Sequence, residues 1–332
     1  MNILVTGGAG FIGSHLCELL LSKPKIKKVI ILDYLQDGEI KNIKHLLKSK
    51  KVILLKKNIN KLKSIDRYFK NVDVVVHLAA LSDIVPSIDN PKNYVETNII
   101  GTMNILEAMR KNNVKKIIYA ASSSCYGIPN KYPTSEKEII NCKYPYSFTK
   151  NIGEQLIKHW SKVYKLDYIS LRLFNVYGTR SRTHGAYGAA LGVFLKQKLS
   201  NKPFTIVGNG RQKRDFVYVK DVCDAFYRSI LSNKKNTIFN VGYGEPKSIN
   251  YLVNLIGGKK IYIPKRPGEP NITHSNIKKI KKVLNWKPKT DLEKGIKIIL
   301  QNIDYWKNAP LWTPKKISDK TKNWFKYLKN EK

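Results

Sequence analysis

The sequence contains few acidic residues, cysteines, histidines and methionines. Its 332 residues include 24 Asp and Glu against 61 Lys and Arg, with four cysteines, six histidines and three methionines. The cysteines are scattered, with no C-x-x-C pair and no His spacing typical of a metal site, so we expect free thiols in a reducing cytoplasm and no bound metal. No uninterrupted apolar run is long enough to cross a bilayer, and the first predicted strand begins at residue 3. We therefore expect neither a membrane segment nor a signal peptide.

The excess of basic residues gives a net charge of +37. A surface for nucleic acid would explain it, because basic chains bind polyanions without sequence preference. The lysines are spread along the whole chain, however, and Asn and Ile are abundant too, as an AT-rich genome would produce. We favour compositional drift and expect no specific nucleic-acid partner, with a non-catalytic RNA-binding scaffold as the alternative. A positive field would also attract anionic small molecules.

A glycine-rich turn organises the start of the chain. The apolar run 3–5 predicts a buried strand, and an apolar-periodic helix begins near Gly13. Between them lies a G-x-G-x-x-G pattern, whose glycines permit a tight turn and a close approach of the backbone to a pyrophosphate. A second predicted strand, 29–32, ends in Asp33, 20 residues after Gly13, where a carboxylate can bind the adenosine ribose. No Arg or Lys follows Asp33 directly, which favours NAD over NADP.

Strands and helices alternate through the first half of the chain. Further strands are predicted at 52–55, 74–77, 116–120 and 169–173, and helices at 61–69, 98–111, 146–164 and 189–199. This order predicts an α/β fold, a doubly wound parallel sheet of the Rossmann type with a smaller α/β C-terminal lobe that binds substrate. We place the NAD-binding domain at 1–175 and the substrate lobe at 176–332, with a return to the sheet around 215–241.

Two segments bring reactive groups to the carboxyl edge of this sheet. A serine-ended strand leads into 122–127, and Tyr146 and Lys150 lie one turn apart on a predicted helix. An ammonium lowers the pKa of a neighbouring tyrosine from about 10, so Tyr146 is expected to act as a general base near pH 7. A serine hydroxyl from the preceding loop can share the substrate proton.

The sequence resembles the extended short-chain dehydrogenase/reductases, in particular their NAD-dependent nucleotide-sugar epimerase/dehydratase group. The matching segments run in family order from residue 1 to about 300: 6–15, 77–80, 98–102, 122–127, 146–150, 172–178, 214–219 and 266–269. The resemblance implies tightly held NAD, a nucleotide-sugar substrate and a cytoplasmic enzyme. It also implies a homodimer formed through the helices at 98–111 and 146–164.

The resemblance also implies roles for individual residues. Those at the family's catalytic positions are Ser122, Tyr146 and Lys150, although Ser123 and Ser124 are alternatives for the hydroxyl. Those expected to bind NAD are Gly7, Gly8, Gly10, Phe11, Ile12, Gly13, Asp33, Asn58, Ile59, Leu78, Ala79, Ala80, Asn98, Tyr146 and Lys150. Asn58 stands where relatives carry Asp, and its carbonyl can still accept a hydrogen bond from the adenine amine. Those expected to bind substrate are Ser123, Ser124, Asn175, Arg214, Arg266 and Thr273, where forked arginine donors suit a diphosphate.

These assignments favour a 4-epimerase of UDP-hexoses that acts through a transient 4-keto sugar. The alternative is a 4,6-dehydratase, whose relatives place Asp-Glu directly after the catalytic hydroxyl, because elimination needs an acid and a base there. Here that pair is Ser123-Ser124. In the family the position of Thr273 helps to gate the space near the C2 substituent, so a small residue predicts that N-acetylated hexoses also fit. The aromatic tail, with Trp306, Trp312, Trp324 and Phe325, is expected to form a helical cap or an interface and no part of the site.

Overall fold

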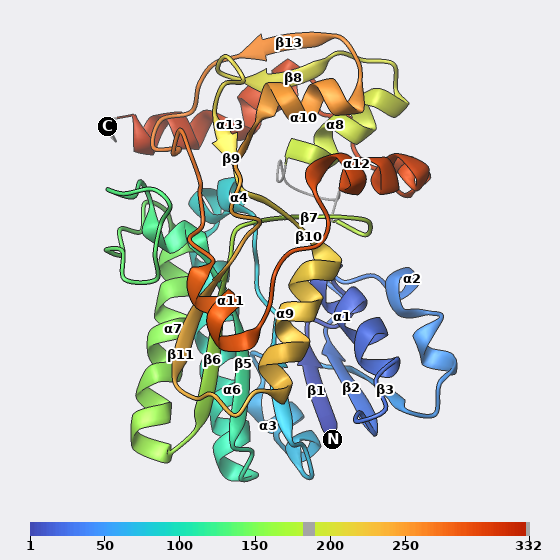
Figure 1. Cartoon of the computed structure of the whole chain (residues 1–332), viewed down its shortest axis with the longest axis vertical. Helices are drawn as coiled ribbons and strands as arrows, with labels where there is room; N and C mark the ends of the chain where they lie inside the picture. Colours follow the sequence, from blue (N-terminus) through green and yellow to red (C-terminus); the bar gives the residue numbers. More distant parts are fainter. Residues whose placement is uncertain (182–189, 330–332) are drawn as a thin grey trace.

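A seven-stranded parallel sheet forms the larger layer of the molecule (Figure 1). In this computed structural model, which describes residues 1–181 and 190–329, the strand order is β11-β6-β5-β4-β1-β2-β3. The strands are β1 (Asn2–Thr6), β2 (Lys28–Asp33), β3 (Val52–Lys56), β4 (Val74–His77), β5 (Lys116–Ser122), β6 (Asp167–Leu173) and β11 (Thr237–Val241). The predicted Rossmann-type sheet is confirmed, and the order of its strands reverses between β1 and β4, where dinucleotides bind in such sheets.

Helices cover both faces of the sheet because alternate residues of each strand point to opposite sides. In β1, Ile3 and Val5 join one core with α1 (Phe11–Leu21) and α9 (Val219–Leu231), while Leu4 joins the other with α6 (Gly101–Lys111) and α7 (Pro145–Tyr164). Short helices complete these layers: α2 (Ile40–Ile43), η1 (Leu46–Lys48), α3 (Leu62–Ile65), η2 (Asp66–Phe69), α4 (Ile84–Asp89), α5 (Pro91–Tyr94), η4 (Ser123–Tyr126) and α11 (Lys278–Leu284).

The helices differ from the predicted ones in detail. The segment expected as one helix at 61–69 is α3 followed by the 3₁₀ turn η2, and the helix expected from 98 begins as a π-helical turn, η3 (Val95–Ile100), that continues into α6. The helix expected at 189–199 is α8 (Ala190–Leu199), and residue 189 lies outside the described residues.

A smaller lobe lies above the carboxyl edge of the sheet (Figure 1). It contains the parallel pair β8 (Phe204–Val207) and β13 (Lys260–Ile263), with α8, α10 (Ile249–Ile256), α12 (Leu292–Gln301), η5 (Ile303–Trp306) and α13 (Pro314–Leu328). Two short pairs join the lobes, β7 (Asn175–Tyr177) with β10 (Phe216–Tyr218) and β9 (Lys213–Arg214) with β12 (Lys247–Ser248). In the described residues no helix is long and apolar enough to cross a membrane.

Candidate active site

A cleft of about 540 Å³ separates the sheet from the smaller lobe. One part of its wall is the loop between β1 and α1 together with Asp33, and another is the segment around Arg266. Ser122, Tyr146 and Lys150 also line it. The cleft thus brings together most of the predicted site residues. It is also lined by residues that were not predicted as part of the site, among them Tyr34, Lys57, Asp83, Thr97, Ser181, Glu269 and Trp324.

The glycine loop forms a close-fitting cradle at the start of α1. Gly7 has φ of +68°, and a Cβ there would lie 2.8 Å from the backbone nitrogen of Ala79, so a side chain would be both strained and obstructed. A Cβ on Gly13 would collide with the carbonyl oxygen of Gly7, because α1 packs directly on the turn. No side chain of the described residues caps α1, and its first amides lie at the cleft wall with Phe11 and Ile12. Such a bare helix start suits a pyrophosphate.

Asp33 supports the adjoining part of the cleft. Its carboxylate accepts hydrogen bonds from the backbone nitrogens of Ala9 at 2.9 Å and Leu35 at 2.8 Å. Burial raises its pKa, while these two hydrogen bonds lower it. Asn58 also lines the cleft, and its Oδ1 accepts the backbone N–H of Asn60, which leaves the second lone pair of that oxygen for another donor. The cradle, the carboxylate and this amide fit the phosphates, ribose and adenine of NAD.

A buried chain of hydrogen bonds, which no sequence pattern predicted, fixes the loop after β4. Thr102 donates to the carbonyl oxygen of Asn98 at 2.6 Å, so its hydroxyl accepts from Nε2 of His77 at 2.9 Å. Nδ1 of His77 then accepts from Thr6 at 2.7 Å, and burial lowers the pKa of His77 to about 3, which keeps the ring neutral. The Thr6 oxygen in turn accepts from two backbone amides of the cleft wall, those of Leu78 and Ala79.

Asn98 lies behind the cleft wall. Its Oδ1 accepts the Leu81 amide at 2.9 Å, and its Nδ2 donates to the Leu81 carbonyl at 3.0 Å and to Thr149 at 3.0 Å. Leu81 lines the cleft, so Asn98 ties this wall to helix α7. This contact makes Asn98 a support for the predicted NAD site.

Ser122, at the carboxyl end of β5, and Tyr146, in the first turn of α7, face the same part of the cleft. Burial raises the pKa of Tyr146, and a hydrogen bond with Ser122 lowers it. The expectation that the ammonium of Lys150 would lower this pKa is therefore corrected: desolvation dominates. Ser122 Oγ also lies 2.8 Å from Ser124 Oγ, while Ser123 and Ser124 are absent from the cleft wall.

Lys150 is buried one helical turn after Tyr146, with its Nζ 4.3 Å from the centroid of the Tyr119 ring. Burial lowers its pKa to about 7, and the nearby carboxylate of Glu154 opposes this shift. That carboxylate is held by Arg172, with N–O distances of 2.6 and 3.1 Å, so it compensates the lysine only in part. At neutral pH Lys150 is thus able to gain and lose a proton.

The expected substrate residues divide into two groups. Asn175 and Arg266 line the cleft. Arg214 lies behind them, where it donates to the carbonyl oxygen of Pro270 at 2.9 Å and faces Glu269 at 3.6 Å. Glu269 is also 2.8 Å from Nε of Arg266. Arg214 therefore braces the loop that carries Arg266.

Thr273 also lies outside the cleft wall, and its hydroxyl forms hydrogen bonds within the protein. It donates to Oδ1 of Asn175 at 2.8 Å and accepts from the backbone nitrogen of Asp215 at 3.0 Å. The fully buried Asp215 carboxylate accepts in turn from the backbone nitrogens of Tyr243, Gly244 and Ser275. Thr273 is thus part of a structural junction and positions Asn175.

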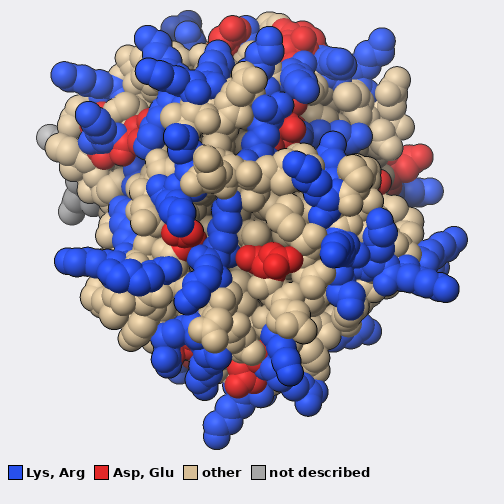
Figure 2. Space-filling model, turned by 60° about the horizontal axis from the view of Figure 1, so that its bottom comes forward, with Lys and Arg blue, Asp and Glu red and all other residues tan. Residues whose placement is uncertain are grey.

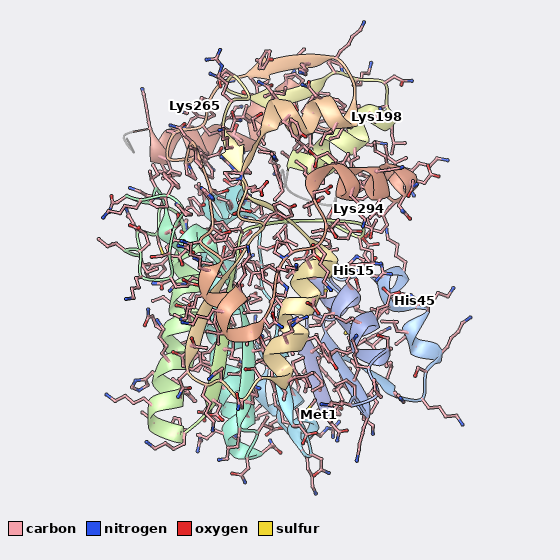
Figure 3. The ribbon with its side chains drawn as sticks, viewed as in Figure 1. Met1, His15, His45, Lys198, Lys265 and Lys294 are labelled. Carbon is pink, nitrogen blue, oxygen red and sulfur yellow. The ribbon has the colours of Figure 1, made fainter. Side chains whose placement is uncertain are left out.

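An ion-pair cluster on α1 holds the segment that leads out of β7. Glu18 lies 3.0 Å from Arg180 and 3.3 Å from His45, and His15 contacts the carbonyl oxygen of Thr179 at 2.9 Å. Figure 3 labels the two histidines, which come from α1 and from the turn between α2 and η1. Burial lowers the pKa of His15 to about 4. The cluster fixes Thr179 and Arg180 beside the cleft.

The fold and this site define a dinucleotide-binding α/β enzyme with a serine, a tyrosine and a lysine beside the cofactor cleft. The model of the NAD dependent epimerase/dehydratase family matches residues 3–242, and the chain belongs to that family.

Relatives and solved structures agree with this assignment. A Methanocaldococcus jannaschii protein, provisionally named a UDP-glucose 4-epimerase, is 39% identical over 305 residues, which are 90% of this chain and 97% of the relative. The UDP-N-acetylglucosamine 4-epimerase of Methanobrevibacter ruminantium M1, solved with UDP-N-acetylmuramic acid, superposes with a TM-score of 0.84 at 31% identity, over 91% of this chain and 98% of that one. The UDP-glucuronic acid 4-epimerase of Bacillus cereus, solved with UDP-glucuronic acid and NAD, gives 0.85 at 32%, over 92% and 99%. The chain is thus an NAD-dependent enzyme, and its relatives support nucleotide-sugar 4-epimerase activity without agreeing on the sugar.

Proposed function

We propose that this protein is a UDP-hexose 4-epimerase. The observation that carries the proposal is the cleft itself, in which Ser122, Tyr146 and Lys150 lie between a cradle for a dinucleotide and the Arg266 segment. A hexose placed between these two parts of the wall presents its ring to the tyrosine. The names of the relatives support the same reaction.

The residues divide the work of proton transfer and binding. Tyr146 takes the proton of the 4-hydroxyl as C4 becomes a ketone, and Ser122 shares that proton and orients the hydroxyl. Because burial raises the pKa of Tyr146, its own proton must first leave, and Lys150, whose pKa of about 7 keeps part of it as a neutral amine, accepts that proton. Arg266 binds the diphosphate, and Asn175 donates to the sugar-nucleotide. NAD would be held by the glycine cradle, Asp33 and Asn58, and would supply a reversible acceptor for the C4 hydride, so the reaction would have no net redox change. Inversion at C4 would require the 4-keto sugar to turn its other face to the cofactor.

Elimination of water, as in a 4,6-dehydratase, is disfavoured by the residues that follow Ser122. Ser123 and Ser124 stand where elimination needs an acid and a base, and a hydroxyl serves poorly as either near pH 7. Ser124 Oγ is moreover engaged with Ser122 Oγ.

The test is to incubate the purified protein with UDP-glucose, UDP-N-acetylglucosamine, UDP-glucuronate and dTDP-glucose, and to separate the products. We expect 4-epimers from UDP-glucose and from its N-acetylated analogue. A 4-keto-6-deoxy product, or conversion of the uronate alone, would contradict the proposed substrate class. Cytoplasmic location stays an expectation.

A further inference from the structure

The C-terminal helix α13 forms part of the roof of the cleft. It packs on α4 through an apolar cluster that contains Val85, Ile317, Trp324 and Leu328, and Asn323 donates to Asp89 of α4 at 2.8 Å. Figure 1 shows α13 beside α4 at the upper left of the molecule. Ile84 and Val85 of α4 line the cleft, so the tail touches a wall of the site.

Trp324 connects this helix to the loop that carries Arg266. Its indole nitrogen donates to the carbonyl oxygen of Pro267 at 2.9 Å, and the Arg266 guanidinium lies 5.7 Å from a ring centroid of Trp324. On another side the indole packs against Tyr144, with ring centroids 5.7 Å apart. Trp324 itself lines the cleft. The expectation that the aromatic tail takes no part in the site is therefore corrected at this residue.

We propose that Trp324 is a positioning residue that holds Arg266 in place to bind the diphosphate of the nucleotide sugar. The inference rests on the proposed function, which assigns the diphosphate to Arg266. The C-terminal helix α13 thereby contributes a residue to the nucleotide-binding site.

The physical reason is the freedom of an arginine side chain. An arginine has four rotatable bonds, and ordering them on binding weakens affinity, whereas a guanidinium already fixed by its surroundings binds an oxyanion without that loss. Here two contacts fix its plane: Glu269 lies 2.8 Å from Nε, and the Trp324 indole is close to it. The bond to the Pro267 carbonyl also tethers the loop, whose next residue, Gly268, adopts φ of +72° in a tight turn. Without Trp324 the guanidinium loses one of these contacts and can rotate away from the position that binds the ligand.

The first experiment measures UDP affinity by calorimetry, together with KM and kcat, for Trp324→Leu, Trp324→Phe and the control Trp312→Phe. The control changes another tail tryptophan, which packs in the same cluster but lies outside the cleft wall. For Trp324→Leu we expect the UDP Kd and the KM to rise about tenfold, the range of a partly desolvated cation–π contact, with kcat changed by less than about twofold. Trp324→Phe keeps a ring beside Arg266 but loses the bond to Pro267, so we expect a rise of about threefold. NAD content stays at the wild-type value in all three.

The second experiment combines Trp324→Leu with Arg266→Ala. If Trp324 acts through Arg266, the double variant binds UDP no more weakly than Arg266→Ala alone. Additive losses would overturn the inference, as would equal losses in Trp312→Phe and Trp324→Phe. If Trp324→Leu does not fold, as judged by circular dichroism, the comparison of the two phenylalanine variants carries the test.

UDP binding tests the inference about Trp324, whereas epimerase turnover tests the proposed function, so the two can fail independently. A protein that binds UDP with this dependence on Trp324 but epimerises no hexose would retain the inference and lose the proposed function. A wild type that does not bind UDP would overturn the inference.

Discussion

Lys150 is a costly residue for this fold to bury. An ammonium removed from water favours its neutral form, and the nearby carboxylate of Glu154 is already shared with Arg172. The resulting pKa of about 7 lies far below the usual 10.5. The pKa of Tyr146, in the preceding turn of the same helix, is raised by burial. At neutral pH Tyr146 is therefore protonated and Lys150 is partly neutral, so base catalysis by Tyr146, as proposed above, requires Lys150 to accept the tyrosine proton.

The first prediction concerns Tyr146→Phe. It removes the hydroxyl that takes the substrate proton and keeps the ring, so we expect turnover to fall at least about 10³-fold, within the range of general base catalysis. Bound NAD, measured after denaturation, should stay at the wild-type level. The control is Tyr164→Phe, an exposed tyrosine at the end of the same helix, which should change neither quantity. A Tyr146→Phe enzyme with a near-native rate would show that another group is the base.

The second prediction concerns the pH dependence of stability caused by Lys150. Between pH 7 and about 10.5 the unfolded chain holds a proton on this lysine that the folded chain has released, so raising the pH favours folding. We therefore expect the free energy of unfolding of the wild type, measured in urea, to rise across this range relative to that of Lys150→Met. Below pH 7 the difference should be constant. A difference independent of pH from 6 to 10 would contradict the lowered pKa.

The third prediction concerns Thr273, whose hydroxyl bridges Asp215 and Asn175. Thr273→Val leaves the buried N–H of Asp215 without an acceptor, so we expect the protein to lose about 1–3 kcal/mol of unfolding free energy. The freed Asn175 amide should raise KM for the nucleotide sugar. Thr273→Ser keeps the hydroxyl and serves as the matched control. Equal stability of the valine and serine variants would show that the bridge contributes nothing.

The variant Thr273→Tyr distinguishes two roles for this residue: limiting the space for the C2 substituent of the sugar, or holding Asn175 in place. The gating role predicts a loss of UDP-N-acetylglucosamine turnover with UDP-glucose turnover retained. A side chain that acts only by holding Asn175 predicts equal losses for both substrates.

At the scale of elements, the sequence predicted best the helices and strands that have a clear apolar pattern and the glycine-rich turn between β1 and α1. The strands β1 to β6 and the α7 helix lie within a residue or two of their predicted bounds, because buried parallel strands are uniformly apolar and α7 is long and amphipathic. For β11 only a return to the sheet around 215–241 was predicted, without the bounds of a strand. The two-residue strands β9 and β12 and the π-helical turn η3 carry no such pattern, since contacts distant in sequence determine them.

The same distinction holds in the site. The glycine cradle, Asp33 and the pair Tyr146 and Lys150 have fixed local spacings and were predictable. Trp324 was not, because it reaches the cleft only through the packing of α13 on α4. A sequence pattern contains no sign of such a contact.

The fourth prediction is a homodimer formed by η3, α6 and α7. Exposed apolar side chains lie on η3 and α7, where a surface in water would be expected to be polar: Val95 and Ile100 on η3, and Phe148, Val163 and Tyr164 on α7. Two copies packed through these helices would bury an apolar interface. We expect a dimer in sedimentation at micromolar protein, and a monomer for Phe148→Lys combined with Val163→Lys.

Tyr262→Lys, which changes an exposed aromatic of β13 in the other lobe, is the control and should remain dimeric. A monomeric wild type at this concentration would contradict the proposed interface.

At the scale of the whole molecule, the charge of +37 is distributed over the surface. Figure 2 shows Lys and Arg across the entire visible face, separated by uncharged surface and by a few acidic residues, with no single basic track. A protein that reads nucleic acid by sequence gathers its basic side chains around one groove-sized element. This distribution agrees with compositional drift, and it surrounds an anion-binding cleft with positive potential.

The fifth prediction follows from that distribution. Scattered lysines neutralise phosphates and release counterions without contacting base edges, so any binding of RNA or DNA should be weak and independent of sequence. If about six phosphates are neutralised, affinity should fall on the order of 10³-fold between 50 and 200 mM salt. Fluorescence anisotropy with labelled oligonucleotides of unrelated sequences, titrated at both salt concentrations, measures this slope. The KM for a UDP-sugar, which carries only two phosphates, should rise far less over the same range. Binding that persists at 200 mM salt and prefers one sequence would instead indicate a specific nucleic-acid site on this protein. It would contradict compositional drift as the origin of the charge.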